Sequence, residues 1–309
     1  MSELTGVILS AGKGSRIDPF NSQYPKPLLP IGNVPILGHH IAMMRTLGIR
    51  RVVIVVGHLM ERIIAHFGRG DAFGVEITYV EQDRILGIAH AVGQAERYVE
   101  GDFLLCLGDI HYRSTRIHEL VDTFRERRLD GVLAVKRETD PKIVQKNFTV
   151  ETGAEGLVTR VIEKPRKPKN LLKGCGIYMF SEAIFDCIRR TPRTALRDEY
   201  EITTSIQILL DDGGRVAAAD VIDEDLNVTF PHDLLDGNVE HLRHAGMRNL
   251  IDPTAQLAAP ELLNLCTVGA GARIAARELT ECVILPQAVV PEGPPLQRAI
   301  ISRDVLLRC

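Results

Sequence analysis

The stretch Gly6-Val-Ile-Leu-Ser-Ala-Gly-Lys-Gly-Ser-Arg16 places a short apolar run directly before a glycine-rich turn. The apolar run is typical of a strand that is buried on both faces of a parallel sheet. Gly12 and Gly14 let the backbone bend sharply, and the amides of such a turn can cradle phosphate oxygens. The turn also carries two cations and a hydroxyl, on Lys13, Arg16 and Ser15. The stretch therefore predicts a phosphate-binding loop at the end of a strand.

Two common phosphate-binding loops are excluded by spacing. A Walker A loop needs Ser or Thr after its Gly-Lys pair, whereas Gly12-Lys13 is followed by Gly14. A dinucleotide fingerprint needs a third glycine where this chain has Ile17. Downstream, the segment Tyr24-Pro-Lys-Pro-Leu-Leu-Pro30 holds Lys26 between two prolines. Because proline restricts the backbone, this segment is expected to aim one cation in a fixed direction.

The first 240 residues alternate strand-like and helix-like segments. Strands are predicted at 52–56, 75–80, 103–107, 131–135, 157–162, 176–180 and 215–222. Helices are predicted at 34–47, 59–67, 87–99, 117–128, 181–190, 202–210 and 231–244. This rhythm predicts an α/β, Rossmann-like fold, with an open, mostly parallel sheet and helices on both faces. Ligands bind such sheets beyond the carboxyl ends of the strands, which points to the loops after residues 9, 80 and 107.

The composition and the periodicity of the sequence change near residue 250. Small residues there alternate with Val, Ile and Leu, and an apolar residue recurs about every six positions, as in 268–274 and 289–296. This period is typical of a left-handed β-helix. We therefore expect a catalytic domain over 1–245 and a short hexapeptide-type β-helix over 246–309, with an irregular β-rich tail as the alternative.

Composition excludes several classes of protein. Lys and Arg number 37 and Asp and Glu number 40, so the net charge of −3 gives no strong field for nucleic acid or an anionic membrane. No apolar stretch approaches the roughly 18 residues of a membrane span. The first residues, Met1-Ser-Glu-Leu-Thr5, lack the basic flank of a signal peptide. A cytoplasmic protein is the expectation.

Further motifs follow the glycine-rich loop and the Pro-Lys-Pro segment in a fixed order: Glu81-Gln-Asp-Arg-Ile-Leu-Gly-Ile-Ala-His90, Leu107-Gly-Asp109, Val161-Ile-Glu-Lys-Pro165, Gly176-Ile-Tyr-Met-Phe180 and Asn227-Val-Thr-Phe-Pro-His-Asp-Leu234. With these motifs the chain resembles the sugar-1-phosphate nucleotidyltransferases, also called nucleoside-diphosphate-sugar pyrophosphorylases. The resemblance covers roughly residues 1–240, and the tail resembles the β-helix domain of many members.

The resemblance implies a nucleotide site. Arg16 would meet the β- and γ-phosphates, and Lys26 would bridge phosphates near the attacked phosphorus. Gln82 would read the edge of the base, and Gly87 would allow close packing over its ring. The nucleotide-binding set is Ser10, Ala11, Gly12, Lys13, Gly14, Ser15, Arg16, Gln82, Gly87 and Gly108.

The resemblance also implies a metal ion and a sugar-phosphate site. Asp109 would hold Mg²⁺ as the cofactor, and Asn227 stands where many relatives have a second aspartate. Asp225 is the alternative second ligand. The sugar-phosphate set is Asn147, Glu163, Lys164 and Gly176, with Lys164 on the sugar phosphate and Glu163 on the sugar hydroxyls. With Arg16 and Lys26, Lys164 would complete the catalytic cations.

The activity expected from the resemblance joins a nucleoside triphosphate to a sugar 1-phosphate and releases pyrophosphate. One glutamine at the base suits uracil or thymine, and guanine stays open. Relatives often have Tyr-Gly after the segment at Asp140-Pro141, and this chain does not. This leaves open a cytidylyltransferase acting on a phosphorylated acceptor that is not a sugar. The weakened second metal position at Asn227 leaves open a regulatory homologue that binds a nucleotide sugar without turnover. A short β-helix buries its faces against a copy, so a homodimer or homotetramer is expected.

Overall fold

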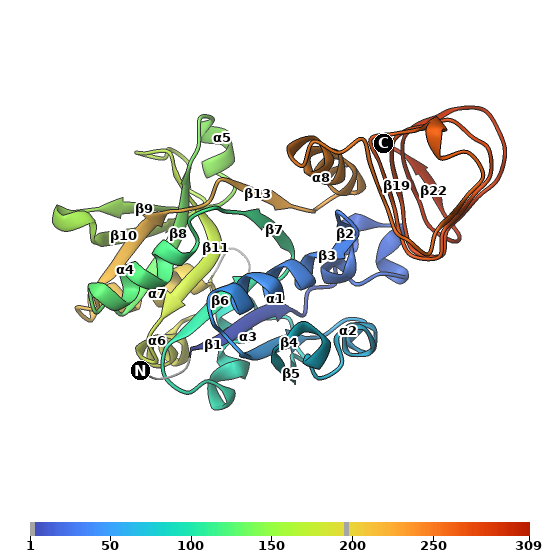
Figure 1. The fold of residues 1–309 in the computed structure, drawn as a ribbon. Coiled ribbons are helices and arrows are strands. Elements are labelled where there is room, and N and C mark those ends of the chain that lie inside the picture. The colour runs from blue at the N-terminus through green and yellow to red at the C-terminus, as the bar shows by residue number, and fades with distance from the viewer. Residues whose placement is uncertain (1–3, 195–197) are drawn as a thin grey trace. The chain divides into compact units, whose positions relative to one another are not determined.

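The computed structural model describes residues 4–194 and 198–309, and the chain contacts divide it into two compact units (Figure 1). Unit 1 combines Met1–Gly12 with His40–Asp225, and unit 2 combines Lys13–His39 with Leu226–Cys309. These units group residues by their contacts, and the division into domains at 1–245 and 246–309 stays a prediction. Each unit is described by itself below.

Unit 1 is built on a mixed nine-stranded sheet (Figure 1). One half is parallel, in the order β6-β1-β4-β5, with β1 at Thr5–Ser10, β4 at Arg51–Val56, β5 at Glu76–Glu81 and β6 at Phe103–Leu107. Apart from the half-buried Arg51, β4 is buried along its whole length, as its β-branched run predicts. The parallel sheet expected from the sequence is confirmed in this half.

The other half of the sheet continues through antiparallel strands. β11 (Leu172–Phe180) pairs with β6, β8 and β9, and all of these ladders are antiparallel. The remaining strands are β8 (Gly131–Arg137), β9 (Phe148–Thr152), β10 (Val158–Glu163) and β12 (Val216–Asp220). β12 pairs with β8 in parallel. A separate ribbon joins β7 (Ile110–Arg113) to β13 (Glu224–Asn227). Sequence periodicity missed β9, which follows the short helix α5 (Pro141–Val144).

Helices cover both faces of this sheet, as expected. Val7, Val53 and Val55 share one hydrophobic core with α3 (Ile88–Ala95), α6 (Ala183–Arg190) and α7 (Ile202–Asp211). Gly6 points to the opposite face because side chains alternate along a strand. There a Cβ on Gly6 would come within 3.1 Å of the Met44 Cε in α1 (Ile36–Thr46). The other helices of this unit are α2 (Met60–Phe67) and α4 (His118–Glu126).

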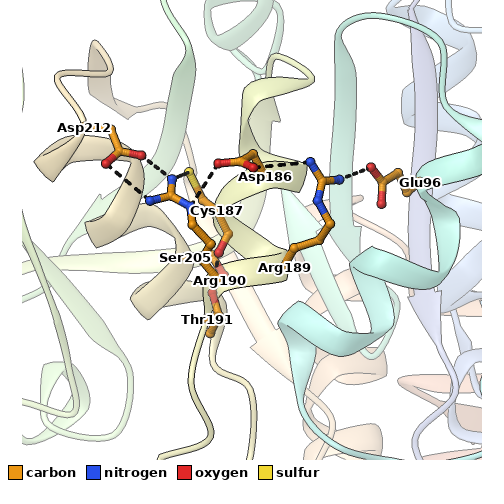
Figure 2. A network of polar contacts seen from close by, with 8 residues as sticks. All are labelled: Glu96, Asp186, Cys187, Arg189, Arg190, Thr191, Ser205 and Asp212. Atoms are coloured by element: carbon orange, nitrogen blue, oxygen red, sulfur yellow. Dashed lines mark hydrogen bonds and ion pairs between the residues drawn. The ribbon is translucent and has the colours of Figure 1, made fainter.

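A polar network joins three of the covering segments at the surface (Figure 2). Arg189 in α6 pairs with Glu96 of the short helix η5 (Glu96–Tyr98), and Arg190 pairs with Asp212 just after α7. Beneath these pairs, the Thr191 and Ser205 hydroxyls lie 2.7 Å apart. The side chains of both arginines are about half exposed, so these pairs add little to stability.

Unit 2 ends in a β-helix whose ladders are parallel except for the last one, which is antiparallel (Figure 1). One of its sheets has the order β14-β17-β19-β21-β22, and another has the order β15-β18-β20. Successive coils keep register, because Asn249 pairs with Cys266 and Thr267 pairs with Val283. The strands are β14 (Asn249–Ile251), β15 (Gln256–Leu257), β16 (Leu263–Asn264), β17 (Cys266–Val268), β18 (Arg273–Ile274), β19 (Leu279–Ile284), β20 (Val289–Val290), β21 (Leu296–Ile301) and β22 (Leu306–Arg308). The expected β-helix-like region is confirmed.

The N-terminal segment of unit 2 packs directly on the β-helix. Phe20 and Leu29 are fully buried in one core with Val283, Leu285 and Ile300 of the coils. The same core includes Leu234 and Leu235 of α8 (Pro231–His244). The amides of Gln23 and Asn33 add polar links, to the Asp304 carboxylate at 3.0 Å and the Val268 carbonyl at 2.9 Å. The segment that carries Arg16 and Lys26 is therefore held by the C-terminal coils. It includes β2 (Pro30–Ile31) and β3 (Val34–Pro35).

Across the described residues, no helix combines the length and the apolar character that crossing a membrane requires.

Candidate active site

In unit 1, the loops after β1 and β6 lie against each other. The main-chain N–H of Gly108 donates to the Leu9 carbonyl at 2.9 Å. A Cβ at Gly108 would lie 2.7 Å from that carbonyl oxygen, so only glycine permits this approach. Ser10 and Ala11 are buried at the end of β1, whereas Gly12 is exposed. Asp109 directly follows Gly108, which places its half-buried carboxylate at the carboxyl edge of the parallel sheet.

The predicted base-reading residues lie at the end of β5 and the start of α3. Gln82 extends the β4–β5 pairing, because its main-chain N–H donates to the Val56 carbonyl at 2.8 Å. Gly87 precedes α3 with φ of +109°, and a Cβ there would lie 2.5 Å from the Tyr200 carbonyl oxygen. The Gln82 Nε2 lies 2.9 Å from the Nδ1 of His90. Sequence reasoning missed His90 and Tyr200, since a single histidine on a helix and a tyrosine after a loop carry no pattern.

The predicted sugar-phosphate residues cluster around the ends of β9, β10 and β11. Glu163 closes β10, where the Thr203 hydroxyl donates to its carboxylate at 3.4 Å. Lys164 has a left-handed backbone, with φ of +43°, and its N–H donates to the Asn147 carbonyl at 2.8 Å. The side-chain amide of Asn147 instead donates to the Ile143 carbonyl at 2.9 Å. Asn147 therefore fixes the Lys164 backbone, and strain of this kind is often stored at functional sites.

Gly176 is the last member of the predicted sugar-phosphate set. Its φ is +71°, and a Cβ there would come 2.7 Å from the Leu107 side chain and 2.8 Å from the Tyr112 hydroxyl. This position of β11 must therefore be glycine to keep β6, β7 and β11 in contact.

In unit 2, the predicted cations follow a left-handed glycine. Gly14, with φ of +59°, precedes the short helix η1 (Ser15–Ile17). Lys13, Ser15 and Arg16 are exposed, as phosphate ligands must be before binding. Lys26 begins the helix η3 (Lys26–Leu28) and is only 8% exposed, and its Nζ donates to the Asn227 Oδ1 at 3.0 Å. The structure thus brings together two predicted residues that are 201 positions apart.

Asp225, the alternative second metal ligand, is held in a buried ionic cluster of unit 1. Its carboxylate accepts from the Lys173 Nζ at 2.6 Å, and Lys173 also pairs with Glu138 at 2.8 Å. Burial alone would lower the pKa of Lys173, but Asp225 and Glu138 raise it above its ordinary value, so the lysine is charged. Lys136 lies 3.8 Å from Asp225 and completes the cluster. The Asp225 carboxylate thus accepts from a lysine, as the Asn227 Oδ1 does from Lys26, and the choice between them as second metal ligand stays a prediction.

The donor chemistry fits a hard divalent ion. Asp109 in unit 1 offers carboxylate oxygens, and Asn227 in unit 2 offers a carbonyl oxygen; each is by itself a ligand type that Mg²⁺ prefers. Within residues 4–194 and 198–309, no cluster of three or more His, Cys, Asp or Glu could hold a metal. A magnesium ion would thus depend on one or two side chains together with substrate phosphates, which is its usual mode of binding.

The comparisons with known proteins show the family of the chain. The family model described as nucleotidyl transferase matches residues 5–238. Two Haloferax volcanii proteins are similar to this chain. The low-salt glycan biosynthesis nucleotidyltransferase Agl11 is 35% identical, and the match covers 76% of this chain and 65% of that protein. The UTP–glucose-1-phosphate uridylyltransferase AglF is 34% identical, and the match covers 74% of this chain and 93% of that protein. The match with Agl11 thus spans less than two thirds of that protein's length. A glucose-1-phosphate thymidylyltransferase of Streptomyces griseus is 30% identical over 97% of this chain and 87% of its own.

Among solved structures, a candidate glucose-1-phosphate thymidylyltransferase from Bacillus anthracis, in complex with sucrose, matches with a TM-score of 0.69. The two chains are 26% identical, and the match covers 77% of this chain and 95% of the other. The resemblance read from the motifs is therefore confirmed: this chain belongs to the nucleotidyl transferase family, among the sugar-1-phosphate nucleotidyltransferases.

Proposed function

We propose that this protein transfers a nucleotidyl group from uridine or thymidine triphosphate to a hexose 1-phosphate, with Mg²⁺ as cofactor, and releases pyrophosphate. The observation that carries the proposal is the set of loop ends in unit 1, where Gly108, Gln82 and Lys164 each follow a strand of one sheet. The glucose-1-phosphate thymidylyl- and uridylyltransferases among the relatives support the same class of substrate.

The reaction is a direct displacement at the α-phosphorus. An oxygen of the sugar phosphate forms the new bond to phosphorus, and the bond to pyrophosphate breaks, so pyrophosphate carries away its electron pair. The sugar phosphate is already anionic near neutral pH, and no general base is needed. Arg16 and Lys26 stabilise the charge on the leaving pyrophosphate, and Lys164 orients the attacking phosphate. Asp109 would hold Mg²⁺, whose charge would further neutralise the phosphates.

A matrix of substrates tests this function. Purified protein is incubated with each of five nucleoside triphosphates and a panel of hexose 1-phosphates, heptose 1-phosphates and phosphorylated alcohols, and pyrophosphate release is measured. We expect turnover with uridine or thymidine triphosphate and a hexose 1-phosphate. Preference for CTP with a phosphorylated alcohol would replace this function by the cytidylyltransferase alternative. Absence of pyrophosphate in every well would favour the regulatory homologue.

Lys164→Ala should raise KM for the sugar 1-phosphate by about 10- to 100-fold. A hydrogen bond to a charged group contributes about 1.5–3 kcal/mol, and each 1.4 kcal/mol is a factor of ten. Because this contact exists before and during the reaction, the loss falls on KM rather than kcat. Steady-state kinetics with each substrate varied in turn measures both constants.

Lys167→Ala is the matched control, since Lys167 is an exposed lysine three residues further along. It should leave both KM values unchanged. An equal rise of KM for the nucleotide in Lys164→Ala would contradict the assignment of this lysine to the sugar phosphate.

A further inference from the structure

The Gln82 side chain is held by a neighbour that the proposed reaction does not use. Gln82 is 6% exposed, and its Nε2 lies 2.9 Å from the Nδ1 of His90 on the first turn of α3. With the amide in this orientation its nitrogen donates to Nδ1, which corresponds to the neutral tautomer of His90 with the proton on Nε2. This hydrogen bond therefore selects one of the two orientations of the Gln82 amide.

The surroundings of His90 keep the ring neutral and in place. Burial lowers the pKa of His90 below its ordinary value of 6.5, and the charge of Arg84 lowers it further. The His90 ring stacks on the Tyr200 ring, with centroids 6.2 Å apart. The Arg193 guanidinium lies 5.8 Å from the centroid of the Tyr200 ring. Among the described residues, Arg84 acts on the charge of His90, Tyr200 stacks on its ring, and Arg193 lies over the far partner of that stack.

The same tyrosine fixes the backbone between Gln82 and His90. The Tyr200 N–H donates to the Leu86 carbonyl at 2.7 Å, and its carbonyl accepts from the Ala89 N–H at 3.0 Å. These bonds lie on both sides of Gly87. The histidine, the glycine and the segment after Tyr200 therefore form one rigid frame around the Gln82 amide.

We propose that His90 is a positioning residue that locks the Gln82 amide and thereby selects uracil or thymine over cytosine. The inference rests on the proposed function, in which Gln82 meets the base edge. With one Nε2 hydrogen committed to His90, Gln82 presents one donor and one acceptor in fixed order. Uracil and thymine offer N3–H and a carbonyl at position 4, whereas cytosine offers a bare N3 and an amino group. Cytosine needs the flipped amide, and with the ring proton on Nε2 the flip would set Oε1 against the Nδ1 lone pair.

His90→Phe tests this role of the hydrogen bond to Gln82. Phenylalanine keeps a ring that can stack on Tyr200, but it has no hydrogen-bond acceptor. The measurement is kcat/KM for the preferred triphosphate, uridine or thymidine, divided by kcat/KM for CTP, with the same sugar 1-phosphate. We expect a ratio of about 10² or more in the wild type, reduced at least tenfold in His90→Phe. His118→Phe, at an exposed position of α4, is the control and should keep the wild-type ratio.

The pH profile of the wild type provides a second, independent readout. The ratio should hold at neutral pH and fall as the pH drops below about 6.5 toward 5.5, because protonated Nδ1 becomes a donor and favours the flipped amide. Titration of the phosphates cancels, since both nucleotides carry the same triphosphate. In His90→Phe the ratio should not vary with pH over this range, and circular dichroism verifies folding at each pH.

Two results would overturn the role of His90. One is a kcat/KM ratio in His90→Phe equal to that of the wild type, and the other is a ratio in the wild type that does not change with pH. If His90→Phe does not fold, the pH profile of the wild type decides alone. A wild type that prefers CTP would also overturn it. Absence of turnover with every nucleotide is a separate outcome, which refutes the proposed function itself.

Discussion

Asp109→Asn should lower kcat by about 10²-fold or more at saturating substrates and magnesium. Asparagine keeps the shape of the side chain but removes the negative charge that would hold the ion. The backbone at this position is fixed by the 2.9 Å hydrogen bond from Gly108 to Leu9, so the substitution should not disturb the fold. Pyrophosphate release gives kcat, and calorimetry with magnesium and the preferred triphosphate shows whether joint binding is weakened.

Asp122→Asn is the matched control, because it makes the same change at an exposed position of α4. It should behave as the wild type in both measurements. Near-normal turnover of Asp109→Asn at high magnesium would remove Asp109 from the proposed metal site. Activity of the wild type in excess chelator would remove the metal requirement altogether.

The parts of the site that the sequence predicts are those that follow readable strands. Buried parallel strands have continuous apolar runs, and in β1, β4 and β6 these runs mark where each strand ends. Because ligands bind beyond the carboxyl ends, the predicted positions of Gly12 after β1 and Asp109 after β6 follow directly, whereas Gln82 follows β5, which alternates polar and apolar residues. The helix at Pro231–His244 is also confirmed to the residue, since proline opens it. Where no proline marks the end of a helix, the predicted and observed ends differ by several positions. For example, α3 ends at Ala95, whereas the sequence predicts an end at Val99.

The parts that the sequence does not predict depend on contacts between distant segments. Nothing local indicates that Phe20 and Leu29 pack on Val283 and Leu285, because each position is simply apolar. The bond between Lys26 and Asn227 likewise has no signal in either segment. β9 is missed for another reason: its strand Phe148–Thr152 alternates polar and apolar residues over only five positions. Local patterns thus predict elements and loop ends, whereas pairing between elements requires the fold.

The buried ionic cluster is such a pairing, and it carries the largest expected effect on stability. Lys173→Met should lower the free energy of unfolding by about 3–5 kcal/mol. Lys173 is 5% exposed, and its removal leaves the carboxylates of Asp225 and Glu138 buried. Lys136, 3.6 Å from Glu138 and 3.8 Å from Asp225, can compensate only in part, which places the expected loss at the lower end. Denaturant unfolding followed by circular dichroism measures it.

Two further variants separate the loss of the ion pair from a general loss of packing. Arg190→Met removes a cation from an exposed pair with Asp212 and should leave the unfolding midpoint close to the wild type (Figure 2). Lys173→Met combined with Asp225→Leu removes both charges and leaves Glu138 with Lys136, so it should regain much of the stability that the single variant loses. If the double variant were less stable than Lys173→Met alone, the cost would lie in packing around β11 and β13, and the buried charges would not be its cause.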